Sequence, residues 1–123
     1  MKNVWLLLLA GYSGFIFYLS HQAVVAVPAL FLHQDKLLHA AAYALLAFLS
    51  VNYFNYRFAV YRNAVLAAFV FCALYGASDE WHQSFIDGRE ADVLDWLADC
   101  IGAVLMLLAY KAFRAWRTAF SKA

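Results

Sequence analysis

The sequence predicts an all-α integral membrane protein, a bundle of four transmembrane helices with both termini on the cytoplasmic side. Two observations lead to this prediction: an apolar composition and an uneven distribution of basic residues. The 123-residue chain is 67% hydrophobic and only 14% charged, whereas soluble domains are nearer half apolar and one quarter charged. A domain of this length could not bury so much apolar surface within itself, which excludes a soluble globular fold.

Four apolar stretches predict the helices, at about residues 4–20, 36–56, 63–83 and 93–113. A helix needs about 20 residues to cross the hydrocarbon core of a bilayer. Leu37 to Tyr56 meets this length without any Asp, Glu, Lys or Arg. The fourth stretch has the shortest uncharged run, Cys100 to Tyr110, and it spans the membrane only if its helix begins near Val93 and includes Asp99.

The first stretch has an alternative interpretation as a secretory signal peptide, because Lys2 is followed by an apolar run. This run is longer than a usual signal core. Gly11, Ser13 and Gly14 also give it a face of small residues suited to close helix contact. We therefore expect a retained transmembrane helix, followed from Ser20 to Gln34 by an interfacial or short re-entrant segment.

Charge asymmetry sets the predicted orientation. With four spans, seven of the nine basic residues fall on the side of the termini: Lys2, Arg57, Arg62, Lys111, Arg114, Arg117 and Lys122. Only Lys36 and Arg89 fall on the other side. Because Lys and Arg concentrate in cytoplasmic loops, both termini are predicted to lie inside, in the bacterial cytoplasmic (inner) membrane. All eight acidic residues lie instead at the outer ends of helices or in outer loops.

Polar groups from three helices are expected to meet at one level near the outer leaflet. Three pairs of polar residues, each four positions apart, share helix faces at this level: Asp35 and His39, Asp79 and Gln83, Asp95 and Asp99. Ionisable groups at that depth are costly unless they face the bundle or a wet cavity, and they mark a functional site by default. His39 lies deeper than Asp35 and Lys36, so we expect it to bond an acid of a neighbouring helix.

The order and spacing of these residues resemble the signature of the VanZ-like membrane proteins. The resemblance is carried by Asp35-Lys36-Leu-Leu-His39, by Tyr75-Gly76-Ala-Ser-Asp79-Glu80-Trp-His82-Gln83, and by Gly88-Arg89 followed by Asp92, Asp95 and Gly102. It implies a single VanZ-like transmembrane domain over residues 1–123, in the envelope of a bacterium. It also implies kinship with a founding member tied to resistance to the glycopeptide teicoplanin.

The resemblance carries over eight family-type positions as candidate ligand-binding residues: Asp35, Lys36, His39, Asp79, Glu80, Gln83, Arg89 and Asp95. Two positions depart from the family pattern. Asp99 stands where Asn is common, and Met106 stands where many members have a small residue. The second departure bears on how closely the fourth helix packs.

Three functional classes remain open. The first binds a lipid-linked or glycopeptide-type headgroup at the outer leaflet, with Arg89, Lys36 and His39 as donors, and affects susceptibility to envelope antibiotics. The second is a membrane-embedded enzyme that acts on such a lipid by acid–base or cation-assisted chemistry, with His39, Asp79 and Glu80 as candidate catalytic residues. The third is a structural partner protein without a ligand site. We favour the first class because no nucleophile stands out.

The charged groups also have purely structural interpretations. Asp35 and Lys36 suit the solvated start of a helix, where Asp is favoured by the helix dipole. Arg89 suits a salt bridge to Asp92 or Asp95 as well as it suits a phosphate or carboxylate ligand. Both interpretations remain open from the sequence.

Cofactors and partners are constrained by what the sequence lacks. His39 and carboxylates are ligands that zinc accepts, but the chain has no HExxH-type pair and no closed four-ligand pattern. We therefore expect no cofactor and no tightly held structural metal. The basic tail from Lys111 to Lys122 is expected to meet anionic membrane lipid rather than nucleic acid.

Overall fold

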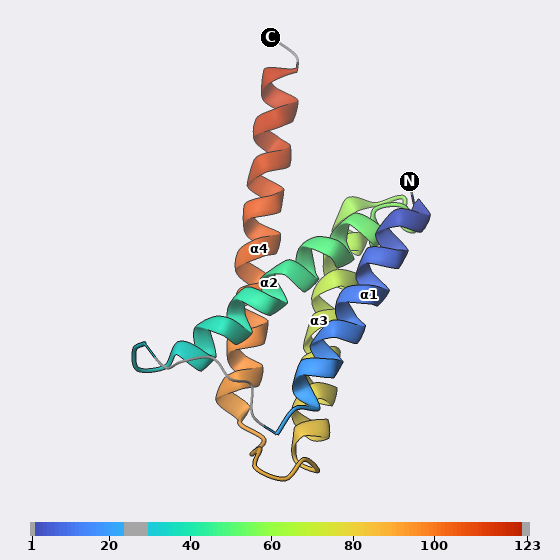
Figure 1. Ribbon diagram of the computed structural model, residues 1–123. Coiled ribbons are helices and arrows are strands. Elements are labelled where there is room, and N and C mark those ends of the chain that lie inside the picture. The colour runs from blue at the N-terminus through green and yellow to red at the C-terminus, as the bar shows by residue number, and fades with distance from the viewer. Residues whose placement is uncertain (1, 24–29, 122–123) are drawn as a thin grey trace.

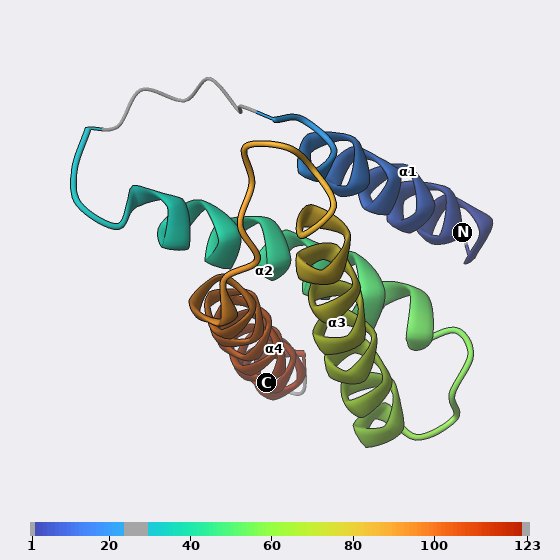
Figure 2. The same ribbon diagram turned by 90° about the horizontal axis from the view of Figure 1, so that it is seen from below.

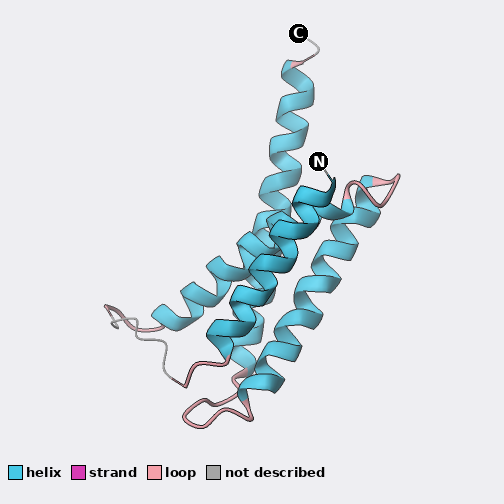
Figure 3. Ribbon diagram, turned by 45° about the vertical axis from the view of Figure 1, so that its right-hand side comes forward, coloured by secondary structure: helices cyan, strands magenta, loops and turns pink. Residues whose placement is uncertain are grey.

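The computed structural model describes residues 2–23 and 30–121, and in these ranges the chain forms four helices joined by loops (Figure 1, Figure 3). The helices are α1 (Lys2–Ser20), α2 (Gln34–Phe54), α3 (Tyr61–Gln83) and α4 (Val93–Phe120). Each is long and apolar enough to cross a membrane. The predicted all-α fold with four transmembrane helices is thus confirmed, and the chain is a multi-pass membrane protein.

Successive helices run in opposite directions. Figure 1 shows both termini at the end of the molecule where α2 connects to α3, and the connections α1–α2 and α3–α4 at the opposite end. This arrangement puts the two termini on one side of a membrane, as the predicted topology requires. We call the end that carries the α1–α2 and α3–α4 connections the outer end, following the predicted orientation.

The helix boundaries differ from the predicted ones mainly at α4, which continues to Phe120 rather than ending near 113. The sequence from Lys111 to Phe120 contains no Gly or Pro, so nothing interrupts the helix where its apolar run ends. Its last turns are exposed and project beyond the other three helices (Figure 1, Figure 3). The interfacial segment predicted between Ser20 and Gln34 includes residues 24–29, which lie outside the described residues.

The helices pack around α2, which α1 and α4 approach from opposite sides (Figure 2). The buried apolar core combines large and small side chains, among them Tyr43, Leu46, Ala47, Val51, Ala68, Cys72, Ala103 and Leu107. Many large apolar residues remain exposed, such as Leu7, Leu66 and Leu105. Such exposed side chains suit contact with lipid tails, where a soluble protein would expose them to water.

Small residues bring α4 against α2. A Cβ atom added to Gly102 would overlap the backbone of Ala40, so only glycine fits at this crossing. Close backbone approach at small residues is a general device for packing helices in membranes. The expectation that Gly11 and Gly14 serve this purpose in α1 is wrong, because a Cβ atom on either would meet no atom of the described residues within 4 Å.

We predict that Gly102→Ala lowers the free energy of unfolding by about 1–3 kcal/mol, because the added carbon forces α2 and α4 apart. Thermal unfolding in detergent micelles, followed by circular dichroism, measures the change. Gly11→Ala is the matched control and should leave stability unchanged or slightly higher, since it adds a carbon to open space on a helix. Equal effects of the two substitutions would contradict this packing.

Candidate functional site

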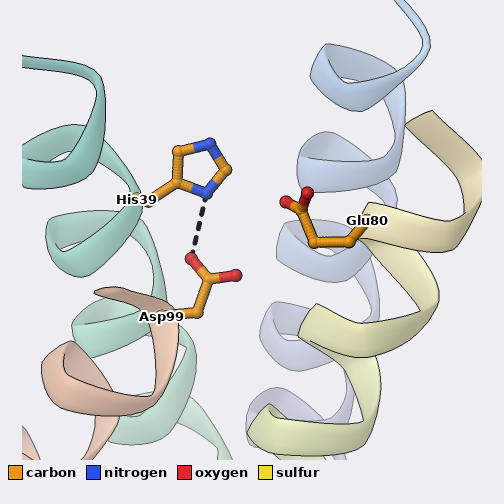
Figure 4. Close-up of side chains that lie close together, drawn as sticks. All are labelled: His39, Glu80 and Asp99. Carbon is orange, nitrogen blue, oxygen red and sulfur yellow. Dashed lines mark hydrogen bonds and ion pairs between the residues drawn. The ribbon is translucent and has the colours of Figure 1, made fainter. Parts of the chain in front are cut away.

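Three helices each deliver one polar side chain to a common point near the outer end. His39 comes from α2, Glu80 from α3 and Asp99 from α4, and Figure 4 shows Glu80 pointing toward the other two. His39 Nδ1 lies 3.0 Å from Asp99 Oδ1. Each of the three residues offers a nitrogen or oxygen atom that lies within 4.8 Å of the other two. The expectation that His39 bonds an acid of a neighbouring helix is met by Asp99.

The two carboxylates at this point are buried and only half satisfied. Asp99 is fully buried, and Glu80 is 7% exposed. One oxygen of Glu80 accepts a hydrogen bond of 2.8 Å from the backbone N–H of Asp92. The other oxygens, Glu80 Oε1 and Asp99 Oδ2, have no hydrogen-bond partner among the described residues. Buried acceptors of this kind are rare in folded proteins and call for a proton, an ion or a ligand.

The start of α4 determines where its acids lie. Asp92 is the N-cap, and its side chain accepts a hydrogen bond of 2.8 Å from the backbone N–H of Leu94. Aspartate is among the strongest N-cap residues because it satisfies a backbone donor of the first turn. With the helix beginning at Val93, Asp95 falls in its first turn and Asp99 one turn deeper.

Lys36 joins the beginning of α2 to the beginning of α4. Its ammonium lies 3.0 Å from a carboxylate oxygen of Asp35, 2.5 Å from one of Asp92 and 2.7 Å from one of Asp95. Lys36 and the N–H of Leu94 lower the pKa of the Asp92 carboxyl, which lies outside the membrane-spanning segments. Since this pKa is depressed in the folded protein, the stabilisation is present at neutral pH and is lost as the pH falls below the usual carboxyl range.

A cavity of about 660 Å³ lies beside this cluster, between α1, α2 and the outer end of α3. Its apolar walls come mainly from α1, from the turn before α2 and from the start of α2: Tyr12, Phe15, Ile16, Leu19, Phe31 and Leu38. Its polar lining includes Asp35 and His39 of α2, Asp79 and Gln83 of α3 and Arg89 of the loop after α3, together with Ser20, His33 and Gln34. Asp79 and Gln83 are themselves buried, and Gln83 Nε2 donates a long hydrogen bond of 3.5 Å to Asp79.

The family model for VanZ/LLP1 matches residues 3–114, nearly the whole chain. The chain belongs to the VanZ/LLP1 family. The predicted resemblance to VanZ-like proteins is thereby confirmed. Searches of curated proteins and of solved structures found no similar protein.

The eight positions singled out by the VanZ-like signature divide into two groups in space. Five of them, Asp35, His39, Asp79, Gln83 and Arg89, line the cavity. The other three, Lys36, Glu80 and Asp95, do not line it. Lys36 and Asp95 belong to the ion-paired network, and Glu80 points toward His39 and Asp99 (Figure 4).

Arg89 takes neither of its expected salt bridges. No ion pair joins it to Asp92 or Asp95 in the part of the chain that the structure describes, and both of these acids pair with Lys36 instead. Arg89 lines the cavity from the loop after α3. Arg89 thus lies at the cavity and outside the ion-paired network of Lys36.

Sequence reasoning did not assign Asp99 to the site, although two signals for it were present. Asp99 shares a helix face with Asp95, and it is the deepest acid of its helix. Tyr43 was also missed: it lines the cavity, and its buried hydroxyl has no hydrogen-bond partner among the described residues. Nothing in the sequence distinguishes this tyrosine from the other aromatic residues of the spans.

We predict that Lys36→Met lowers the free energy of unfolding by about 1–3 kcal/mol, because it leaves Asp92 and Asp95 without their cation. The loss should be smaller than for a fully buried pair, about 3–5 kcal/mol, since the Lys36 side chain is 22% exposed. Unfolding in detergent micelles at neutral pH measures this loss of free energy. In Asp35→Asn the lost partner is 60% exposed, so the effect should stay below about 1 kcal/mol. A Lys36→Met variant as stable as the parent would contradict the role of this network.

Proposed function

We propose that the protein binds the headgroup of a lipid-linked envelope precursor in the cavity between α1 and α2. The site would face the outer leaflet of the bacterial cytoplasmic membrane. The observation that carries the proposal is the division of the cavity into apolar walls and a polar lining. An amphipathic molecule that enters from the bilayer needs both, because its chain remains in an apolar environment while its headgroup requires hydrogen-bond partners.

The size of the cavity supports this proposal. Its volume of about 660 Å³ falls within the 300–1,000 Å³ that is usual for small-molecule sites. Phe15, Ile16 and Leu19 of α1 form one wall, and a hydrocarbon chain can pack against them without losing hydrogen bonds.

The polar lining supports a hydroxyl-rich or basic headgroup. Asp79 and Gln83 offer acceptors and donors of the kind that bind sugar hydroxyls. Arg89 adds a planar fork of five donors for a carboxylate or phosphate. The predicted outer side of the chain holds all eight acids and only two basic residues. This acid excess disfavours a headgroup that consists of phosphate alone.

Membership of the VanZ/LLP1 family supports a role in the envelope. Sequestering a lipid-linked precursor, or altering its exposure at the outer leaflet, would change how a glycopeptide antibiotic meets its target. We therefore propose that an effect on susceptibility to such antibiotics follows from lipid binding by this cavity.

A second candidate function is acid–base catalysis on the same lipid, favoured by the hydrogen bond between His39 and Asp99. A carboxylate that orients a histidine ring is a common arrangement for a general base. Within the described residues, however, no Ser, Thr or Cys side chain hydrogen-bonds to His39. The binding function needs no such nucleophile, so it remains the preferred proposal.

We predict that Arg89→Lys weakens lipid binding at least about tenfold, because a lysine ammonium cannot reproduce the guanidinium fork. One lost charge-assisted hydrogen bond accounts for a change of this size. Native mass spectrometry of the purified protein identifies the co-purifying lipid, and titration of that lipid into protein in nanodiscs measures the affinity.

Two further variants sharpen this experiment. Asp79→Asn keeps the shape of the side chain but removes its charge, and it should also weaken binding. Asp87→Asn changes an exposed acid in the same loop as Arg89 and should bind like the parent. If Arg89→Lys and Asp79→Asn both fold and bind lipid like the parent, the cavity is not the binding site. If no envelope lipid co-purifies, the structural alternative is favoured.

A further inference from the structure

The carboxylates of Glu80 and Asp99 are buried beside each other with the ring of His39 at their side (Figure 4). The described part of the chain provides no lysine or arginine for either of them, because Lys36 is paired with Asp35, Asp92 and Asp95. We propose that His39, Glu80 and Asp99 bind a divalent transition-metal cation, with Zn²⁺ as the best match to one imidazole and two carboxylates. This site shares His39 with the cavity, but neither Glu80 nor Asp99 lines the cavity, so the proposal adds to the proposed function without depending on it.

The spacing of the three residues fits a metal centre after a small adjustment. With metal–ligand bonds of about 2.0–2.2 Å, the ligand atoms of a tetrahedral zinc site lie about 3.3–3.6 Å apart. His39 Nδ1 and Asp99 Oδ1 are already 3.0 Å apart, so a cation could replace the proton that they share. The widest separation in the group is at most 4.8 Å, a gap that rotation of the flexible Glu80 side chain can close.

The free acceptor atoms provide an independent indication of a ligand. Glu80 Oε1 and Asp99 Oδ2 are buried, and neither has a hydrogen-bond partner among the described residues. Glu80 Oε2 is held by the backbone N–H of Asp92, which orients the Glu80 carboxylate to offer its other oxygen to a metal. When the ion replaces the proton between His39 Nδ1 and Asp99 Oδ1, Asp99 Oδ2 belongs to the same carboxylate and can turn toward that ion.

Gly76 keeps space free beside Asp99. A Cβ atom at this position would lie 3.0 Å from Asp99 Oδ2 and 3.3 Å from the ring of Tyr43. Any larger residue would therefore press on the oxygen that has no partner. Glycine allows α3 to pass close to α4 at the depth of the proposed ion.

Electrostatics favour a cation at this point. Two carboxylates that are both ionised and close together in a low-dielectric region repel each other strongly. A divalent cation compensates both charges, and it satisfies the free oxygens at the same time. Three protein ligands would leave one tetrahedral position for water or another ligand, as in zinc sites that perform chemistry. The alternative, in which a proton neutralises one carboxylate, predicts no metal binding.

The test is a zinc titration of the full-length protein in a non-ionic detergent, after removal of metal with a chelator. A fluorescent zinc indicator that competes for the metal measures the affinity. We expect one equivalent of Zn²⁺ per chain. Asp99→Asn and Glu80→Gln should each weaken zinc binding at least about tenfold. Removing a direct metal ligand weakens binding more than removing a residue that only hydrogen-bonds to a ligand.

His82→Gln is the matched control, because His82 and His21 form a second pair of imidazoles that could bind zinc. His82 Nε2 lies 3.2 Å from His21 Nδ1, and neither histidine belongs to the group of the three proposed ligands. The control should bind zinc as the parent does. Absence of saturable binding by the parent would overturn the proposal, and so would a loss in His82→Gln as large as the loss in Asp99→Asn.

X-ray absorption of the zinc-loaded parent protein keeps the proposal testable if the variants fold poorly. The expected spectrum shows nitrogen and oxygen neighbours at about 2.0–2.2 Å, with scattering from a single imidazole. Scattering from two or more imidazoles would assign the ion to another place, such as His21 and His82. A sulfur neighbour would also overturn the proposal.

Discussion

Helices α2 and α4 touch backbone to backbone where Gly102 meets Ala40, and this contact determines how the outer end of the protein is built. Ala40 follows His39 directly in the chain. Asp99 precedes Gly102 by three residues, so the two lie on the same face of α4. The close packing of Gly102 against Ala40, one turn deeper, therefore brings Asp99 Oδ1 to 3.0 Å from His39 Nδ1. A larger residue at Gly102 would separate these side chains as well as the helices.

Above this contact the polar residues form two layers with different chemistry. The outermost layer is held by ion pairs, because Lys36 pairs with acids from both α2 and the start of α4. The layer beneath contains His39, Glu80 and Asp99, with buried oxygens that the described residues do not satisfy. Ionisable groups inside a membrane are costly and mark function by default. The first layer thus accounts for stability, and the second, with the adjoining cavity, accounts for the proposed functions.

Much of the fold followed from the sequence, because uncharged apolar runs of membrane-spanning length have few alternatives to a helix. The site was predicted less completely. Residues four apart reveal which side chains share a face, but they do not tell which neighbouring helix that face meets. For this reason a bond from His39 to an acid was foreseen while its partner, Asp99, was not. The prediction of close packing at the small residues of α1 failed for a related reason. Gly11 would allow another helix to approach closely, but the sequence does not tell whether a neighbouring helix lies there.

The packing of α2 against α4 places His39 against Asp99, and nuclear magnetic resonance of the imidazole nitrogens tests this contact most directly. The chain has four histidines, so ¹⁵N-histidine labelling of metal-free protein in micelles gives few signals, and His39→Gln identifies the signal of His39. We expect Asp99→Asn to shift the Nδ1 resonance of His39 and to leave those of His21, His33 and His82 unchanged. A His39 signal that does not respond to Asp99→Asn in a folded protein would contradict the proposed arrangement.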